Sequence, residues 1–353
     1  MIIDGHLDIA CNIIEGGRDF TASVAANRER EGGPHPHLGT CTLALPDLLR
    51  GGVGLVCATL FTMPASSQAL DLPVEQSYSS AEEAHAQALN QLALYRELAE
   101  RDDVRLVASR ADLAAVQGRW AEGRPQLGIV LLMENADPIR TPDEAAWWYA
   151  QGVRIVGPAW QATRYCGGTR APGPLTADGR ALMGELARCG MILDTSHMAE
   201  ESFWQALELF DGTVIASHSN CRAFVSEARA DRHLSDAMIR ALIERDAVIG
   251  AVLYNAFIIA DYRKGTPKER VGLDDLIRHI DHICQIAGDA HHVAIGSDLD
   301  GGFGRDEIPR ELDSVADLGL IGEALIAKGY SEADTAGVLG GNWLRVLEGS
   351  LPG

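Results

Sequence analysis

Eight short apolar runs, rich in valine, isoleucine and leucine and bounded by glycine, aspartate or proline, recur along this chain of 353 residues. Such runs are typical of strands that are buried on both faces of a parallel sheet. The expected strands are residues 2–8, 54–61, 128–134, 153–158, 191–196, 214–217, 248–254 and 293–298. Helical spacing of apolar residues between most of them predicts helices at residues 80–101, 142–151, 179–189, 200–210, 235–245 and 273–288. The alternation of strand and helix predicts an α/β fold with a parallel sheet.

A closed (β/α)8 barrel of the TIM type and an open doubly wound sheet both fit this alternation. The polar residues that follow the expected strands favour the barrel, because only a closed barrel brings the strand ends around one mouth. The chain has the length of such a barrel with insertions, so we expect one domain over residues 1–353. Two irregular stretches, residues 16–39 and 164–176, follow the first and fourth strands and are expected to be loop insertions over the mouth.

Amino-acid composition restricts the classes of binding partner and the cellular location that we expect. The formal net charge of −20 argues against nucleic acid and anionic membrane surfaces. The N-terminal residues show no secretory signal, and no apolar run has the length of a membrane span, so we expect a soluble, cytoplasmic protein. Seven cysteines without a CxxC pair argue against a disulfide framework. The oligomeric state stays open, with a homodimer as one option.

His6 and Asp8 close the first expected strand. Side chains alternate faces along a strand, so these two point the same way while Leu7 points the other. One imidazole and one carboxylate on a single face suit a divalent ion of the zinc type. The pair alone is a weak signal, since a core histidine beside a capping aspartate gives the same pattern, but its place at a strand end favours a ligand role.

Glu134, His197 and His218 follow the third, fifth and sixth strands. A carboxylate after an apolar run is costly to bury unless it is paired or binds metal, although a solvated loop position is the alternative. A lone histidine at a strand end is more often structural, but two of them weaken that interpretation. The set predicts two ions, one held by His6, Asp8 and Glu134 and the other by Glu134, His197 and His218, each with an open catalytic position.

Asp298 follows the last expected strand. We expect its carboxylate to take a proton from a metal-bound water and return it to a leaving group. Asp300 lies two residues further on and either orients substrate or begins the turn with Gly301, and we favour the turn.

These residues in this order resemble the renal (membrane) dipeptidase family of zinc metallopeptidases, a branch of the amidohydrolase superfamily. The resemblance covers nearly the whole chain and rests on residues 4–8 (DGHLD), 45–54 (LPDLLRGGVG), Glu134, 194–197 (DTSH), 217–220 (SHSN) and 296–301 (GSDLDG). It implies a (β/α)8 barrel with two zinc ions bridged by a glutamate and a hydroxide. It also implies cleavage of dipeptides, often with a D-residue tolerated at the C-terminal position.

The resemblance further implies an arginine, shortly after the His-Ser segment, that binds the carboxylate of the substrate. Residues 232–236 (RHLSD) match that motif best and assign the role to Arg232. The segment lies further from His218 than in the family, so Arg229 is a second candidate, and a solvated loop arginine is the alternative reading. A guanidinium fork suits a terminal carboxylate.

Two positions depart from the family pattern. Trp160 stands where the family usually has a histidine that contacts the substrate or the developing oxyanion. The family's Asn-Phe-Tyr becomes Asn255-Ala256-Phe257, which removes a tyrosine hydroxyl. We expect Trp160, Asn255, Phe257 and Asp300 to contact the substrate, and selectivity to move toward a more apolar side chain or away from simple dipeptides.

The predicted function is a zinc-dependent dipeptidase that hydrolyses the amide bond of small dipeptides, with L-Xaa-D-Xaa dipeptides among the candidate substrates. A related binuclear amidohydrolase acting on another small amide, ester or lactam is the first alternative, and the departures at Trp160 and Phe257 favour it. A non-catalytic metal-binding barrel is the second, and Asp298 argues against it because a storage site needs no extra carboxylate. Iron, manganese or cobalt could replace zinc in part.

Overall fold

A computed structural model describes residues 1–66 and 77–353. Within these residues one sheet of parallel strands runs through the molecule. Its members are β1 (Ile2–Leu7), β2 (Val53–Phe61), β3 (Val104–Leu106), β4 (Leu127–Glu134), β5 (Val153–Gly157), β6 (Ile192–Asp194), β7 (Val214–Ile215), β8 (Ile249–Ala251) and β9 (Val293–Ile295). Each of the eight expected strands is present in this sheet, and β3 is an additional short strand beside β4.

The strands close almost completely into a barrel in the order β7-β6-β5-β4-β2-β1-β9-β8. A parallel bridge between Ala216 and Ile249 joins the two ends, and the Gly250 N–H donates to the carbonyl of Ala216 at 2.8 Å. Glycine is needed at this seam, because a Cβ at residue 250 or 296 would lie 1.9 Å from the Ser217 carbonyl oxygen. The (β/α)8 barrel predicted from the sequence is confirmed.

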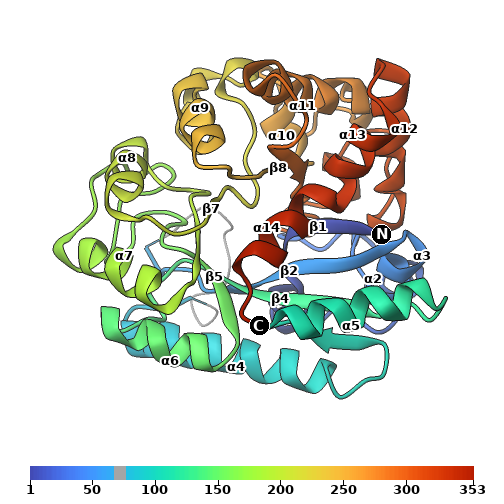
Figure 1. Cartoon of the computed structure of the whole chain (residues 1–353). Helices are drawn as coiled ribbons and strands as arrows, with labels where there is room; N and C mark the ends of the chain where they lie inside the picture. The colour runs from blue at the N-terminus through green and yellow to red at the C-terminus, as the bar shows by residue number, and fades with distance from the viewer. Residues whose placement is uncertain (67–76) are drawn as a thin grey trace.

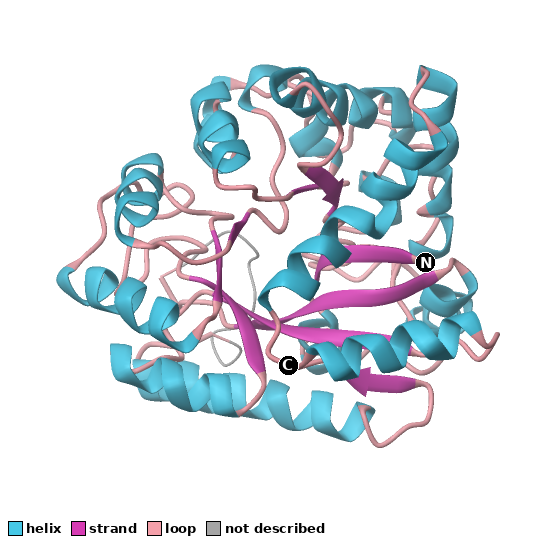
Figure 2. Ribbon diagram, in the orientation of Figure 1, coloured by secondary structure: helices cyan, strands magenta, loops and turns pink. Residues whose placement is uncertain are grey.

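Helices surround the strands, as Figures 1 and 2 show. They are α1 (Ile9–Ile14), α2 (Val24–Glu31), α3 (Leu45–Arg50), α4 (Ala81–Leu98), α5 (Arg110–Ala121), α6 (Ala145–Ala150), α7 (Ala177–Cys189), α8 (Glu200–Leu209), α9 (Asp236–Glu244), α10 (Asn255–Ile258), α11 (Leu273–Ala287), α12 (Gly319–Lys328), α13 (Glu332–Ala336) and α14 (Asn342–Ser350). The helices expected between the strands correspond to α4, α6, α7, α8, α9 and α11. Side-chain caps by Ser80 and Ser235 begin α4 and α9, because the serine hydroxyl accepts an otherwise unpaired N–H of the first turn.

The barrel wall is buried on both faces. Every residue of β1, β2 and β4 is buried, with the barrel interior on one side and the helices on the other. The indole of Trp343 on α14 reaches under the barrel and donates to the Ile295 carbonyl at 2.7 Å. A Cβ at Gly5 would lie 2.4 Å from that indole, so this strand position accepts only glycine.

The two insertions differ in structure. Residues 16–39, expected to be a loop, contain α2, which Ser23 caps and Gly32 ends with a left-handed backbone (φ 67°). Its composition hid this helix, because charged residues dominate the segment and its apolar face is narrow. Residues 164–176 form neither helix nor strand, as expected.

Two further expectations concern cysteines and membranes. All seven cysteines lie within the described residues and are free, and six of them are buried, as expected. None of the helices in residues 1–66 and 77–353 combines the length and the apolar character that crossing a membrane requires.

Candidate metal centre

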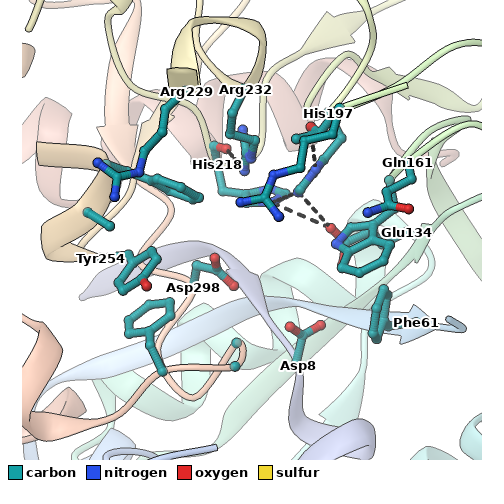
Figure 3. A pocket seen from close by; sticks show the side chains of 18 of the residues that line it. Asp8, Phe61, Glu134, Gln161, His197, His218, Arg229, Arg232, Tyr254 and Asp298 are labelled. Atoms are coloured by element: carbon teal, nitrogen blue, oxygen red, sulfur yellow. Dashed lines mark hydrogen bonds and ion pairs between the residues drawn. The ribbon is translucent and has the colours of Figure 1, made fainter. Parts of the chain in front are cut away.

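The predicted metal ligands converge at the C-terminal mouth of the barrel, and Figure 3 labels all of them except His6. They come from β1, from the end of β4 and from the turns after β1, β6, β7 and β9. The residues are His6, Asp8, Glu134, His197, His218 and the neighbouring Asp298. All are buried except His197, which is nearly so. Residues that are far apart in the sequence therefore form one polar cluster at the barrel mouth.

Glu134 is the centre of this cluster. Its Oε2 lies 3.3 Å from Nε2 of His6, and its Oε1 lies 3.3 Å from Nε2 of His197 and 3.5 Å from Nε2 of His218. One carboxylate oxygen thus faces His6, and the other faces His197 and His218. This arrangement suits a carboxylate that bridges two cations.

The donor set fits divalent metal ions. Nε2 of His6 is buried and makes no hydrogen bond, which is costly unless the lone pair or proton has another partner. The ligand atoms of His6, Glu134 and His218 lie within 4.8 Å of one another, and so do those of His6, Asp8 and Asp298. Two imidazoles and carboxylates at this spacing are ligands of the zinc type.

On one side of Glu134, the surroundings keep the imidazoles of His197 and His218 uncharged. Burial, assisted by Arg232, lowers the pKa of His197 to about 4, and burial with His6 holds the pKa of His218 well below its usual range. Both imidazoles are therefore uncharged at neutral pH, the form that binds metal, and their Nε2 atoms lie 2.9 Å apart.

On the other side of Glu134, carboxylates surround His6. Burial lowers the pKa of His6, but the charge of Glu134 outweighs burial and raises this pKa to about 10, with help from Asp8 and Asp298. Burial raises the pKa of Glu134, yet His6 and the other imidazoles outweigh it and keep the carboxylate ionised. Burial, with Asp8 and Glu134 outweighing His6, holds the pKa of Asp298 well above its usual range.

A hydroxyl that the sequence analysis did not single out orients two of the imidazoles. The Oγ of Ser217 donates to Oδ2 of Asp194 at 2.5 Å and lies 3.0 Å from Nδ1 of His6 and 2.8 Å from Nδ1 of His218. A hydroxyl has one proton and two lone pairs, so it donates to Asp194 and accepts from both rings. This keeps a proton on Nδ1 of each ring and turns both Nε2 atoms toward Glu134.

Ser217→Ala is expected to lower metal affinity by about 10- to 100-fold, because both imidazoles lose the acceptor that fixes their tautomer. Metal titration of the chelator-treated protein measures this effect. Ser314→Ala is the matched control, since Ser314 is also buried but its hydroxyl caps the 3-10 helix of residues 315–317, outside the cavity. Equal metal affinity in the Ser217 variant and in the wild type would remove the orienting role.

The backbone conformation of two of these residues also directs their side chains. His197 (φ 65°) and Asp298 (φ 59°) occupy the left-handed region that residues other than glycine rarely adopt. The Nδ1 of His197 lies 3.0 Å from Oγ1 of Thr169, which comes from the 164–176 insertion. The insertion therefore positions one metal ligand, a role that no sequence pattern revealed.

A cavity of about 270 Å³ opens beside the cluster. Among the residues predicted to bind substrate, Arg232, Trp160, Phe257 and Asp300 line it, and so does Arg229. The cavity lining also includes four residues that were not predicted from the sequence, Phe61, Arg170, Tyr254 and Phe303. Their types carry no signal in the sequence, because aromatic residues and arginines are common outside binding sites.

Asn255 and Asp300, which were also predicted to contact the substrate, bond other parts of the chain. Asn255 is buried at the start of α10, does not line the cavity and donates from Nδ2 to the Ile308 carbonyl at 3.1 Å. The Asp300 carboxylate accepts from Thr42 and Leu43 and pairs with Nη1 of Arg18 at 2.9 Å. These contacts occupy both oxygens of Asp300, which supports its reading as a turn residue.

The chain was compared with protein families, curated sequences and solved structures. The model of the membrane dipeptidase family (Peptidase family M19) matches residues 1–350. An uncharacterized protein of Klebsiella pneumoniae is 36% identical over 57% of this chain and 73% of its own length. A dipeptidase of Aspergillus oryzae, aclJ, is 30% identical over 50% of this chain, and the match spans 39% of its length.

Two solved structures are similar over their whole length. The structure of dipeptidase AC, a metallo peptidase of family M19, has a TM-score of 0.80 and 26% identity over 100% of this chain and 99% of the other. A metallo peptidase from Rhodobacter sphaeroides, bound to a phosphinate mimic of L-Ala-D-Ala, has a TM-score of 0.78 and 26% identity over 99% of each chain. The chain therefore belongs to the membrane dipeptidase family, Peptidase family M19, whose members are metal-dependent hydrolases of peptide bonds.

Proposed function

We propose that the protein is a dipeptidase with two zinc ions bridged by Glu134, and that L-Xaa-D-Xaa dipeptides are among its substrates. The division of the Glu134 oxygens between His6 on one side and His197 with His218 on the other carries the two-ion proposal. The similarity to a metallo peptidase that binds a phosphinate mimic of L-Ala-D-Ala supports the substrate class.

His6, Asp8 and Glu134 would hold one ion, and Glu134, His197 and His218 the other. Bound there, zinc supplies a Lewis acid for the scissile carbonyl and a water of lowered pKa. Asp298 is buried beside His6 and Asp8, and burial holds its pKa above its usual range, so it would take a proton from this water and deliver it to the leaving amine.

Arg232 is the proposed anchor of the substrate's terminal carboxylate. Its side chain is buried, its Nη2 donates to the His218 carbonyl at 2.8 Å, and its Nε has no partner among the described residues. The guanidinium is therefore held in place beside a metal ligand while one donor stays free. A guanidinium fixed beside the His218 carbonyl would position a short peptide with its amide over the proposed metal ions.

The opposite side of the cavity is apolar. Trp160 and Phe61 meet edge to face with ring centroids 5.2 Å apart, and Trp160 lies 6.3 Å from the His197 ring. This wall favours an apolar side chain on the N-terminal residue of the substrate. It is also the observation that favours the second candidate, a binuclear amidohydrolase acting on another small amide, ester or lactam.

A substrate panel with metal analysis tests the proposal. We expect the purified protein to carry two zinc ions per chain and to hydrolyse L,L- or L,D-dipeptides with an apolar first residue, with turnover lost on chelation and restored by zinc. Acyl amino acids and lactams are the comparison substrates. Turnover of these compounds without any hydrolysis of dipeptides would replace the dipeptidase by the second candidate, and full activity of the chelated protein would contradict the metal mechanism.

A further inference from the structure

Three arginines line one cavity in a chain whose net charge is −20. The guanidinium groups of Arg170, Arg229 and Arg232 have no carboxylate within 4.0 Å among residues 1–66 and 77–353, whereas Arg18 pairs with Glu31 and Asp300. Carboxylates also line the cavity, and one of them, Asp231, accepts from the backbone N–H of Arg170. One guanidinium is enough for the single terminal carboxylate of a neutral dipeptide. The two further unpaired guanidinium groups can therefore bind a second negative group on the substrate.

Arg229 and Arg232 lie on the short 3-10 helix η4 (Glu227–Arg232). Residues three apart on such a helix lie on the same side, so both guanidinium groups face the cavity. Nη2 of Arg229 donates to the Tyr262 carbonyl at 3.1 Å, which holds the group in place. Its Nη1 is buried and has no hydrogen-bond partner in the described part of the chain, so one donor is left for a ligand.

The surroundings of Arg229 suit the side chain of an acidic residue. The Tyr254 ring stacks on Phe303 with centroids 4.6 Å apart and meets Phe257 edge to face at 4.9 Å, which provides an apolar wall for methylene groups. Burial and the charge of Glu307 raise the pKa of Tyr254 to about 12, and the charges of Arg229 and Arg170 oppose this shift.

The cavity has two chemically different ends. In Figure 3, Arg229 and Tyr254 lie on one side of His218 and Asp298, and Phe61 and Gln161 lie on the other. The apolar end suits the N-terminal residue, and the end with the arginines suits the residue whose α-carboxylate Arg232 anchors. A second carboxylate beside Arg229 therefore belongs to the side chain of the C-terminal residue.

We propose that Arg229 binds a side-chain carboxylate of the substrate, so that the protein prefers dipeptides ending in glutamate or aspartate. This inference rests on the proposed dipeptidase function. Arg232 engages the α-carboxylate, Arg229 the side-chain carboxylate, and the exposed Arg170 attracts the dianion at the mouth.

The test compares alanyl-glutamate with alanyl-glutamine, and alanyl-aspartate with alanyl-asparagine, using both L- and D-forms of the second residue. The readout is the ratio of kcat/KM between the acidic peptide and its amide, so a general loss of activity cancels. We expect a ratio of about tenfold or more in the wild type, because charge-assisted hydrogen bonds are stronger than neutral ones. Arg229→Gln should bring the ratio close to one, and Arg229→Lys should give an intermediate value.

Arg263→Gln is the matched control. Nη1 of Arg263 donates to the same Tyr262 carbonyl at 2.8 Å, but Arg263 does not line the cavity. The control removes the same charge and a bond to the same atom, and we expect it to keep the wild-type ratio. Arg232→Gln should slow the acidic and the neutral peptides alike.

The possible results distinguish the role of Arg229 from the dipeptidase function on which it rests. Equal rates on acidic and neutral dipeptides in the wild type, or a ratio that falls in Arg232→Gln and not in Arg229→Gln, would overturn the role of Arg229 and leave the dipeptidase in place. No hydrolysis of any dipeptide would overturn both.

Discussion

Replacing Asp298 with asparagine is expected to lower kcat by about a thousandfold or more while metal content stays unchanged. Asparagine keeps the shape of the side chain and one oxygen, but its amide cannot take up and release a proton. Asp298 is buried beside His6 and Asp8, and its raised pKa suits it to carry the proton that the leaving amine needs. Steady-state kinetics and metal analysis on the same preparation measure the two effects.

The exposed Asp306, further along the same loop, provides the control. Asp306→Asn removes the same charge outside the cavity and should keep kcat near the wild-type value. Loss of metal in Asp298→Asn would make Asp298 a ligand, which its place within 4.8 Å of the His6 and Asp8 ligand atoms allows. Undiminished turnover would end its role as the proton carrier.

Glu134→Gln is expected to have an effect at least as large, because it removes the bridge between the two proposed ions. A glutamine offers one acceptor oxygen and points an amide donor at the imidazoles on the other side. We expect metal content to fall below two ions per chain and turnover to fall by about a thousandfold or more, since both proposed sites lose a ligand. Metal analysis after dialysis measures the first effect.

Thermal unfolding with and without chelator measures the second consequence of Glu134→Gln. Ions that bind the folded state stabilise it, so chelator should lower the Tm of the wild type and have little effect on the variant. Glu144→Gln is the control, because Glu144 pairs with Arg140 on the surface and lies outside the cavity. A variant that keeps two ions and the full response to chelator would contradict the bridging role.

The strands and the helices between them were predictable because their burial is nearly uniform. A strand of the barrel wall has no exposed face, so β2 and β4 appear in the sequence as continuous apolar runs. The short strand β3 carries arginine between two apolar residues, and the helix α2 consists largely of polar residues. Both depend on their neighbours for stability, and local sequence patterns do not report such contacts.

The metal ligands were predictable for a related reason. A histidine or a carboxylate directly after an apolar strand needs a partner, and six such residues at strand ends indicate a common one. The orienting roles of Ser217, Asp194 and Thr169 were not predicted, because hydroxyl groups and carboxylates at strand ends are common. Asn255 was assigned to the cavity by resemblance, whereas the start of α10 buries it against the Ile308 carbonyl.

By itself, the sequence determined the barrel and the family and identified the candidate metal ligands, because burial and strand-end position leave a direct pattern in the order of residues. Tertiary structure alone decided how the Glu134 oxygens are shared, which hydroxyl orients His6 and His218, and which arginines face the cavity. These properties depend on distances between side chains from different strands and loops. The packing of strands and loops into the closed barrel sets these distances, so no local stretch of sequence encodes them.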